Sequence, residues 1–176
     1  MKKPIIYTVG HSNRTIEQFV EMLQNNGVRL IVDVRSVPKS RHNPQFNSDS
    51  LKQSLLKAHI SYRRLEKLGG FRHTSKDSVN LGWHHASFRG FADYMATPEF
   101  SDGIDALVKI AGLRETAIMC AEAVPWRCHR SLIADALVKR GWNVRDIMSR
   151  TGASRHILTP FLKIKKGKLV YPASKT

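Results

Sequence analysis

The stretch Arg29-Leu-Ile-Val-Asp-Val-Arg35 decides the fold of this chain. Its apolar residues run almost without interruption instead of alternating with polar ones, which is typical of a strand buried on both faces of a parallel sheet. The apolar segment 4–9, which is rich in β-branched residues, predicts an earlier strand of the same kind.

The segment between these two strands predicts a helix. Thr15 is the expected N-cap, Gln18 stands in the capping-box position, and Asn26-Gly27 ends the helix. The apolar residues recur at helical spacing on one face: Ile16, Phe19, Val20 and Leu23. A strand, a helix and a second strand in this order predict a βαβ unit.

The alternation continues along the chain. A second helix is expected from Ser48 or Asp49, and its apolar face would carry Leu51, Leu55 and Leu56. Residues 69–89 are predicted to be irregular, and loops of that length are usually functional or mobile. Residues 91–111 predict a helix interrupted near Thr97-Pro98, and residues 142–147 predict a strand.

These elements predict an α/β fold of Rossmann-like, three-layer type. A mostly parallel sheet would carry helices on both faces, in a single domain over residues 1–176. Residues 163–176 are expected to form a basic C-terminal extension or a small hairpin around Lys166-Gly167.

The richest chemistry lies in the stretch that starts Thr116-Ala-Ile-Met-Cys120 and continues through Cys128-His-Arg130 into an apolar helical pattern. This stretch is predicted to turn from a buried strand into a helix. A helix N-terminus presents backbone N–H groups and a positive dipole, which favour an anion or a thiolate. The catalytic candidates are therefore Cys120, Glu122, Cys128, His129 and Arg130.

Ordinary structural roles are open for each of these residues. Cys120 could close a core strand as a small hydrophobic residue, and Cys128 could be an incidental thiol at a helix start. Glu122 could be a surface acid, and His129 with Arg130 an ordinary basic first turn. Basic residues at a helix N-terminus oppose its dipole, however, and an arriving acidic ligand would offset that cost.

Polar clusters also follow the two N-terminal strands. His11, Ser12 and Arg14 come after the first, and Asp33 and Arg35 end the second. The carboxyl ends of parallel strands meet at one edge of a sheet, so these clusters and Cys120 are expected to share one pocket. The expected substrate-binding residues are His11, Ser12, Arg14, Asp33, Arg35, Arg41 and Arg127.

Chain length and cysteine content narrow the possible classes of protein. A chain of 176 residues with 41% apolar content suits one domain with a real core. No apolar run approaches the roughly 18 residues of a membrane span, and the basic start leads only into a short strand-like segment. We therefore expect neither a membrane span nor a signal peptide, and we expect a cytoplasmic location. The two cysteines do not make a disulfide framework and are expected to be reduced there.

The charge balance points to an anionic partner. The 29 Lys and Arg residues against 14 Asp and Glu give a net charge of +15, with a pI near 10.3. A strongly basic domain is typical of nucleic-acid binders, although a basic surface can also serve solubility alone. If the fold gathers this charge on one face, a polyanion is the expected partner.

Spaced motifs over residues 5–148 resemble the DUF488 family of small prokaryotic proteins. They are Val9-Gly-His-Ser, Val32-Asp-Val-Arg with Pro38 and Ser40-Arg41, Tyr62 through Leu68-Gly-Gly, Phe91-Ala-Asp-Tyr-Met, Cys120-Ala-Glu, and Cys128-His-Arg. The resemblance implies an α/β domain and marks Cys120, Glu122, Cys128, His129 and Arg130 as signature positions. It brings no established reaction.

The strand, loop and helix around Cys120 also look similar to rhodanese-like and cysteine-phosphatase domains. There a cysteine follows a strand, and an arginine at the helix start helps to bind an oxyanion. This chain departs from that pattern, because six residues separate Cys120 from Arg127 and nine separate it from Arg130, where five are usual. The likeness therefore supports a reactive thiolate more than a phosphate cradle.

Three function classes stay open. The first is an enzyme with Cys120 or Cys128 as nucleophile, Glu122 or His129 as base, and an anionic nucleotide or nucleic-acid substrate. The second is a nucleic-acid-binding module without catalysis, for which Tyr62, Trp83 and Trp126 are stacking candidates. The third is a metal site built from Cys120, Cys128, His129 and His11. The sequence specifies no cofactor and no oligomeric state.

Overall fold

Six strands form the central sheet of the computed structural model, which describes residues 2–175. The strands are β1 (Ile5–Gly10), β2 (Leu30–Asp33), β3 (Ser61–Arg64), β4 (Thr116–Cys120), β5 (Asn143–Ser149) and β6 (Gly152–Arg155), in the spatial order β3-β2-β4-β1-β5-β6. The first five pair in parallel, whereas β6 is antiparallel to β5. The expected mostly parallel sheet is confirmed.

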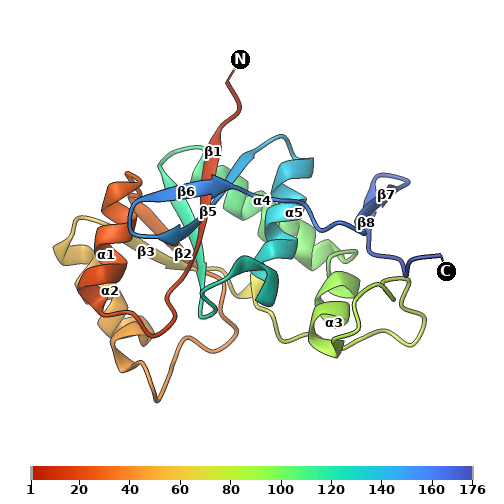
Figure 1. The fold of residues 1–176 in the computed structure, drawn as a ribbon, viewed down its shortest axis with the longest axis horizontal. Coiled ribbons are helices and arrows are strands. Elements are labelled where there is room, and N and C mark those ends of the chain that lie inside the picture. Colours follow the sequence, from red (N-terminus) through yellow and green to blue (C-terminus); the bar gives the residue numbers. More distant parts are fainter. Residues whose placement is uncertain (1, 176) are drawn as a thin grey trace.

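Helices cover both faces of this sheet (Figure 1). One layer holds α1 (Ile16–Asn25) and α2 (Ser48–Lys57), and the other holds α3 (Ala86–Tyr94), α4 (Pro98–Ala111) and α5 (Arg130–Lys139). Side chains of β4 alternate between these layers because successive residues of a strand point to opposite faces. Ala117 and Met119 pack towards α1 and α2, while Ile118 and Cys120 lie with the α3–α5 layer. The three-layer α/β prediction is confirmed.

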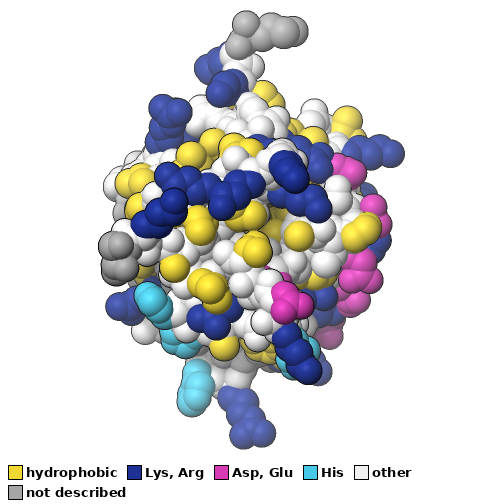
Figure 2. Space-filling view, turned by 90° about the vertical axis from the view of Figure 1, so that its right-hand side faces the viewer, with side chains coloured by type: hydrophobic (Ala, Val, Ile, Leu, Met, Phe, Trp, Pro, Cys, Tyr) yellow, Lys and Arg dark blue, Asp and Glu magenta, His cyan; other side chains and the backbone are white. Residues whose placement is uncertain are grey.

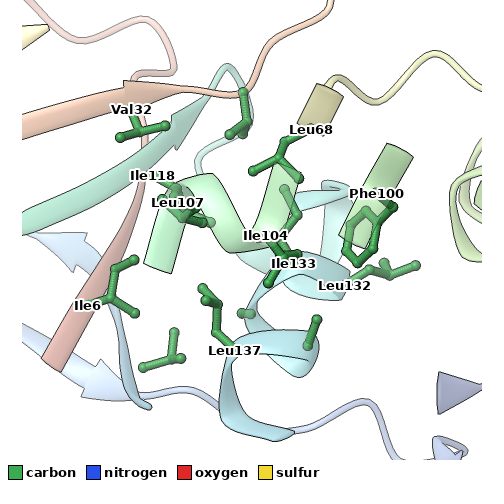
Figure 3. Packing of buried hydrophobic residues seen from close by; sticks show 14 of the residues in the cluster. Ile6, Val32, Leu68, Phe100, Ile104, Leu107, Ile118, Leu132, Ile133 and Leu137 are labelled. Atoms are coloured by element: carbon green, nitrogen blue, oxygen red, sulfur yellow. The ribbon is translucent and has the colours of Figure 1, made fainter. Parts of the chain in front are cut away.

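The larger core fills the space between the sheet and the α3–α5 layer. Figure 3 shows Ile6, Val32 and Ile118 from the strands facing Leu107 and Ile133 from the helices. All five side chains are buried. Burying a side chain of this size contributes about 1.5–3 kcal/mol, so this packing holds the strand ends and the start of α5 in fixed relation.

Local signals in the sequence place several element boundaries. Thr15 caps α1 with the full capping box, since its hydroxyl accepts from the Gln18 amide and the Gln18 side chain accepts from the Thr15 amide. Lys166 and Gly167 both have positive φ and form the two-residue turn between β7 (Lys163–Lys165) and β8 (Lys168–Val170). These two strands make a separate antiparallel hairpin. Met1 and Thr176, at the ends of the predicted 1–176 domain and 163–176 extension, lie outside the described residues.

Other boundaries differ from the sequence prediction. Strand β3 is an edge strand whose residues are at least partly exposed, so the hydrophobic pattern did not reveal it. Leu56 was expected on the apolar face of α2 but is 69% exposed, while Leu51 and Leu55 are buried. Helix α3 begins five residues before the predicted Phe91, at Ala86.

Short 3-10 turns join several elements: η1 (Pro44–Phe46), η2 (Glu66–Leu68) and η3 (Pro125–Arg127). From η2 to α3, residues 69–85 form no helix or strand, as predicted, whereas residues 86–89 of the stretch predicted to be irregular belong to α3. Of the helices within residues 2–175, none is long and apolar enough to cross a bilayer.

Candidate active site

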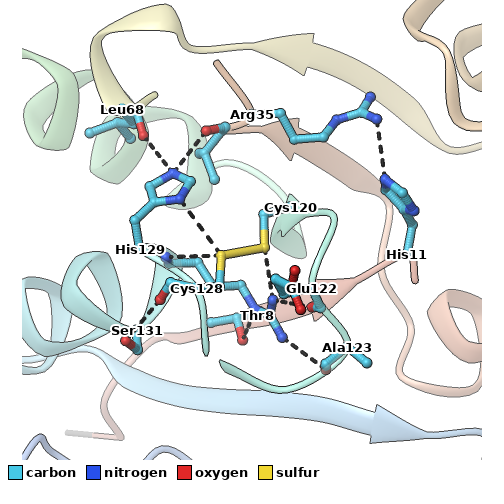
Figure 4. The surroundings of a disulfide bond; sticks show 12 residues. Thr8, His11, Arg35, Leu68, Cys120, Glu122, Ala123, Cys128, His129 and Ser131 are labelled. Carbon is cyan, nitrogen blue, oxygen red and sulfur yellow. Dashed lines mark hydrogen bonds between the residues drawn. A yellow bond between two sulfur atoms is a disulfide. The ribbon is translucent and has the colours of Figure 1, made fainter. Parts of the chain in front are cut away.

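The polar clusters that follow β1, β2 and β4 lie side by side. Strand β4 is paired with both of the others, and Gly10 is in register with Cys120 while Asp33 is in register with Met119. Across this edge, Nη1 of Arg35 donates to Nε2 of His11 over 3.3 Å (Figure 4). The three strand ends therefore bring the His11, Arg35 and Cys120 regions into one neighbourhood, as the parallel sheet predicts.

Arg35 is held rigidly at the end of β2. The Asp33 carboxylate accepts from its Nε at 3.0 Å and from its Nη2 at 2.7 Å, and the Tyr62 hydroxyl donates to the same carboxylate. His11 is neutral, because burial lowers its pKa to about 4, and its Nδ1–H donates to the Ser12 carbonyl. Asp33 and His11 thus position Arg35.

Two adjoining hollows open on this edge, and Arg35 borders both. The first has a volume of about 270 Å³ and contains the two cysteines, Glu122, Arg127 and His129. Its remaining wall is Ser36, Val37, Gly70, Phe71, Ser87, Phe88 and Ala121. The second, of about 450 Å³, lies over His11, Ser12 and Lys39. We call the first hollow the cysteine cleft.

The sulfur atoms of Cys120 and Cys128 are joined in a disulfide (Figure 4). This differs from the expectation that both thiols are reduced. The turn η3 folds the intervening loop back on itself and so returns Cys128, at the start of α5, to the end of β4. The helix start is occupied by the chain itself, since the Arg130 amide donates to Cys128 Sγ at 3.4 Å and the Ser131 amide to the Cys128 carbonyl. It therefore favours the sulfur more than an outside anion.

Arg130 lies fully buried beneath the cysteine loop. Its Nη1 donates to Cys120 Sγ at 2.8 Å and to the Glu122 carbonyl, and its Nη2 donates to the Ala123 carbonyl at 3.1 Å. The loop passes so close to β1 that a Cβ on Gly10 would lie 1.6 Å from the Glu122 carbonyl oxygen. Arg130 consequently organises the loop, and a substrate oxyanion would not reach it as the phosphatase likeness suggests.

His129 has a defined tautomer. Its Nε2 lies 2.9 Å from the Val34 carbonyl and 3.0 Å from the Leu68 carbonyl, and carbonyl oxygens only accept hydrogen bonds, so Nε2 carries the proton. The unprotonated Nδ1 faces Cys128 Sγ at 3.6 Å. Burial lowers the pKa of His129 to about 4, and the ring is therefore neutral near pH 7. His129 therefore presents a neutral hydrogen-bond acceptor to Cys128.

The remaining candidate site residues lie at different positions relative to the two hollows. Glu122 and Arg127 are exposed at the rim of the cysteine cleft. Ser12 borders the second hollow, where its amide donates to the Ala121 carbonyl. Arg14 donates to the Gly10 carbonyl at 2.6 Å and so ties down the chain after β1, while Arg41 is exposed and lines neither hollow. The structure does not bring these two arginines to the cysteines.

A family model described as a domain of unknown function, DUF488, matches residues 15–137. The chain belongs to the DUF488 family. The matched range includes Arg35, both cysteines, His129 and Arg130, but it begins after His11 and is shorter at both ends than the resemblance over residues 5–148. No curated protein and no solved structure matches the chain.

One network of this DUF488 chain was missed by sequence reasoning. His156 lies between two carboxylates, 2.9 Å from Asp135 and 3.0 Å from Asp146. Asp146 accepts from the Thr8 hydroxyl at 2.5 Å, and Thr8 in turn accepts from Nε of Arg130 at 3.3 Å. A buried chain of hydrogen bonds thus connects the C-terminal segment to the cysteine loop. No spacing in the sequence signals it, because its members come from four separate segments.

The geometry does not support the metal alternative. Within residues 2–175, no group of three or more His, Cys, Asp or Glu side chains is placed to hold a metal ion. His11 turns its Nε2 to Arg35 and its Nδ1 to a carbonyl. The guanidinium of Arg130 also lies against Cys120, where it would repel a metal cation.

Proposed function

We propose that this chain is a cytoplasmic enzyme that uses a cysteine thiolate in the cysteine cleft against a small anionic substrate. The observation that carries the proposal is the pairing of Cys128 with the unprotonated Nδ1 of His129. In the reduced protein, the Cys128 thiol has this acceptor beside it and the Arg130 amide on its sulfur. An adjacent base and a helix start are the two common ways to activate a cysteine.

The surroundings of His129 keep its unprotonated Nδ1 beside Cys128. Two carbonyls fix its ring, and Gly70 leaves it room, since a Cβ there would lie 2.7 Å from Nδ1. Because the pKa of His129 is about 4, its neutral imidazole accepts the thiol proton only as Cys128 attacks and passes it directly to the leaving group. Glu122 is an alternative base, but it lies exposed at the rim, and the hydrogen bond that it makes to Arg130 uses its backbone carbonyl.

The walls of the cleft favour an anionic molecule with an apolar body. Asp33 and His11 accept from three of the five N–H groups of Arg35, which leaves two as directional donors. Arg127 adds an exposed positive charge at the rim. Phe71 and Phe88 supply aromatic surface, and about 270 Å³ suits a small molecule or one nucleotide component.

Alkylation of the two thiols tests this proposal. Reduced protein is treated with iodoacetamide over a range of pH, using Cys120→Ser to observe Cys128 and Cys128→Ser to observe Cys120. At least one thiol should titrate well below the ordinary cysteine pKa of about 8.5. His129→Gln, which keeps a donor for the carbonyls and removes the ring acceptor, should slow alkylation of Cys128. Two thiols that behave as ordinary cysteines would overturn the proposal.

A second candidate function, nucleic-acid binding, is favoured by one surface. Figure 2 faces the side of the β7–β8 hairpin and shows a band of Lys and Arg side chains across it. The four hairpin lysines, Lys163, Lys165, Lys166 and Lys168, are exposed. The positive charge is not confined to this face, because Arg63 and Arg64 lie on β3 at the opposite end of the molecule (Figure 1).

The aromatic residues give this candidate less support. Trp126 is 62% exposed and available for stacking. Trp83 instead stacks on Phe88, and the Tyr62 hydroxyl is engaged by Asp33.

A further inference from the structure

We propose that Cys120 and Cys128 form a reversible dithiol–disulfide couple that reduces a low-molecular-weight disulfide carrying negative charge. This inference rests on the proposed function, in which Cys128 is the nucleophile, and adds a role for Cys120 and a substrate class. Its basis is that the two sulfurs bond to each other while both line the same open cleft.

The surroundings of the two sulfurs differ in a way that assigns their roles. Cys128 has a proton acceptor, Nδ1 of His129, and can be deprotonated as it attacks. Cys120 has a permanent cation, since Nη1 of Arg130 lies 2.8 Å from its sulfur. A guanidinium in contact favours a thiolate, and a stabilised thiolate serves as an internal attacking group and as a good leaving group.

The reaction follows from these positions. The Cys128 sulfur attacks one sulfur of the substrate disulfide, which forms a mixed disulfide and releases the first thiolate. The proton that left Cys128 for His129 passes to that thiolate. The Cys120 thiolate then attacks Cys128 Sγ, which forms the internal disulfide and releases the second thiolate. Two electrons pass from the protein dithiol to the substrate, and an external thiol reductant returns the protein to the dithiol.

The buried location of Cys120 also suits this role. Cys120 is 3% exposed and Cys128 is 6% exposed, so a bulky protein disulfide does not reach them readily, whereas a small molecule enters the cleft. Arg35 and Arg127 border the same cleft and provide donors for carboxylate or other anionic groups of the substrate. The chemistry of the walls therefore selects a small anionic disulfide over a cationic one.

The test treats the reduced full chain with glutathione disulfide, which carries carboxylates, and with cystamine, a small disulfide that carries ammonium groups. Intact-mass measurement should show wild type losing a pair of hydrogens without a lasting adduct. Cys120→Ser should instead accumulate a glutathione adduct on Cys128. Cys128→Ser should react about tenfold more slowly, and wild type should prefer glutathione disulfide to cystamine by a similar factor. Cys120→Ala repeats the trapping without a hydroxyl.

The possible results distinguish a failure of the dithiol–disulfide couple from a failure of the proposed function. A lasting adduct on wild type would show that Cys120 does not resolve it, and equal rates with cystamine would remove the anionic substrate class. Either result overturns the inference while an activated thiol in the alkylation test still supports the proposed function. If both thiols alkylate like ordinary cysteines, the proposed function itself fails.

Discussion

Nη1 of Arg130 lies 2.8 Å from Sγ of Cys120, and the whole arginine side chain is buried. The same guanidinium also holds the carbonyls of Glu122 and Ala123. Burial lowers the pKa of Arg130 to about 10, which leaves it charged at neutral pH. One buried cation therefore fixes the loop between the cysteines and sets the electrostatic environment of Cys120.

Replacement of Arg130 by Met should destabilise the fold by about 2–4 kcal/mol, because the buried guanidinium is lost and the Glu122 and Ala123 carbonyls lose their donor. Urea unfolding of the reduced protein measures this free energy. Arg127→Met is the matched control, since Arg127 is exposed and its replacement should change stability by less than about 0.5 kcal/mol. Equal effects of the two substitutions would contradict the organising role of Arg130.

Gly10→Ala should be among the more damaging small substitutions in this chain. The new Cβ would lie 1.6 Å from the Glu122 carbonyl oxygen, so β1 or the cysteine loop must move. We expect a loss of about 1–3 kcal/mol in unfolding free energy, as for other overpacked sites, together with altered alkylation of Cys120. Gly152→Ala is the control, because its Cβ meets no atom within 4 Å. A stable Gly10→Ala protein with unchanged thiol reactivity would refute the close approach.

The layered fold could be predicted because its signals are local. The apolar run of residues 29–35 and the capping box at Thr15 each specify one element, and parallel strands then place His11, Arg35 and Cys120 at one edge. The roles within the site depend on burial and on distant partners. The neutral state of His129 follows from burial, and its tautomer follows from the carbonyls of residues 34 and 68, which no spacing around position 129 reveals.

Burial and distant contacts also explain why the role of Arg130 differs from the one that the sequence predicts. Next to Cys128 and His129 in the sequence, it looks like an exposed anion-binding residue at a helix start. Its side chain instead turns under the loop, because the bend at η3 leaves the Glu122 and Ala123 carbonyls facing the interior. Strand β3 escaped prediction for a related reason, since an edge strand with partly exposed side chains has little apolar periodicity.

Acid should destabilise the protein partly through His129. Its pKa falls from 6.5 to about 4 on folding because burial disfavours the charged ring. The folded state therefore binds fewer protons, and this contribution to stability, about 3 kcal/mol, is present above pH 6.5 and is lost as the pH falls towards 4. Urea unfolding at several pH values should show a shallower acid dependence for His129→Gln than for wild type. Exposed His42→Gln should keep the wild-type slope.

His156 should act in the opposite direction at alkaline pH. Burial opposes its charge, but hydrogen bonds with Asp135 and Asp146 outweigh that effect and raise its pKa from 6.5 to about 9. The stabilisation is fully present below pH 6.5 and is lost as the pH rises through about 9. His156→Gln should reduce stability at neutral pH and remove the decline between these values. A parallel decline in wild type and variant, measured by urea unfolding, would show that His156 is not the titrating group.

Binding to nucleic acid can be tested without knowing the reaction. If the hairpin lysines touch phosphates, log K should fall linearly with log salt by about 0.9 per contact on duplex DNA or about 0.7 on single strands, because each contact releases counterions. Changing Lys163, Lys165, Lys166 and Lys168 together to Gln should flatten this slope. The matched set of Arg41, Arg63 and Arg64, away from the hairpin, should leave it nearly unchanged, and so should Cys128→Ser. Because Arg64 is paired with Glu66 at 2.8 Å, it is less available to phosphate than the exposed lysines.

Two other outcomes would contradict binding through the hairpin. If the slope is unchanged in the lysine variant and flatter in the arginine variant, the nucleic-acid interface lies at the β3 edge instead. Absence of binding at low salt would leave the small anionic substrate as the better account of the positive charge.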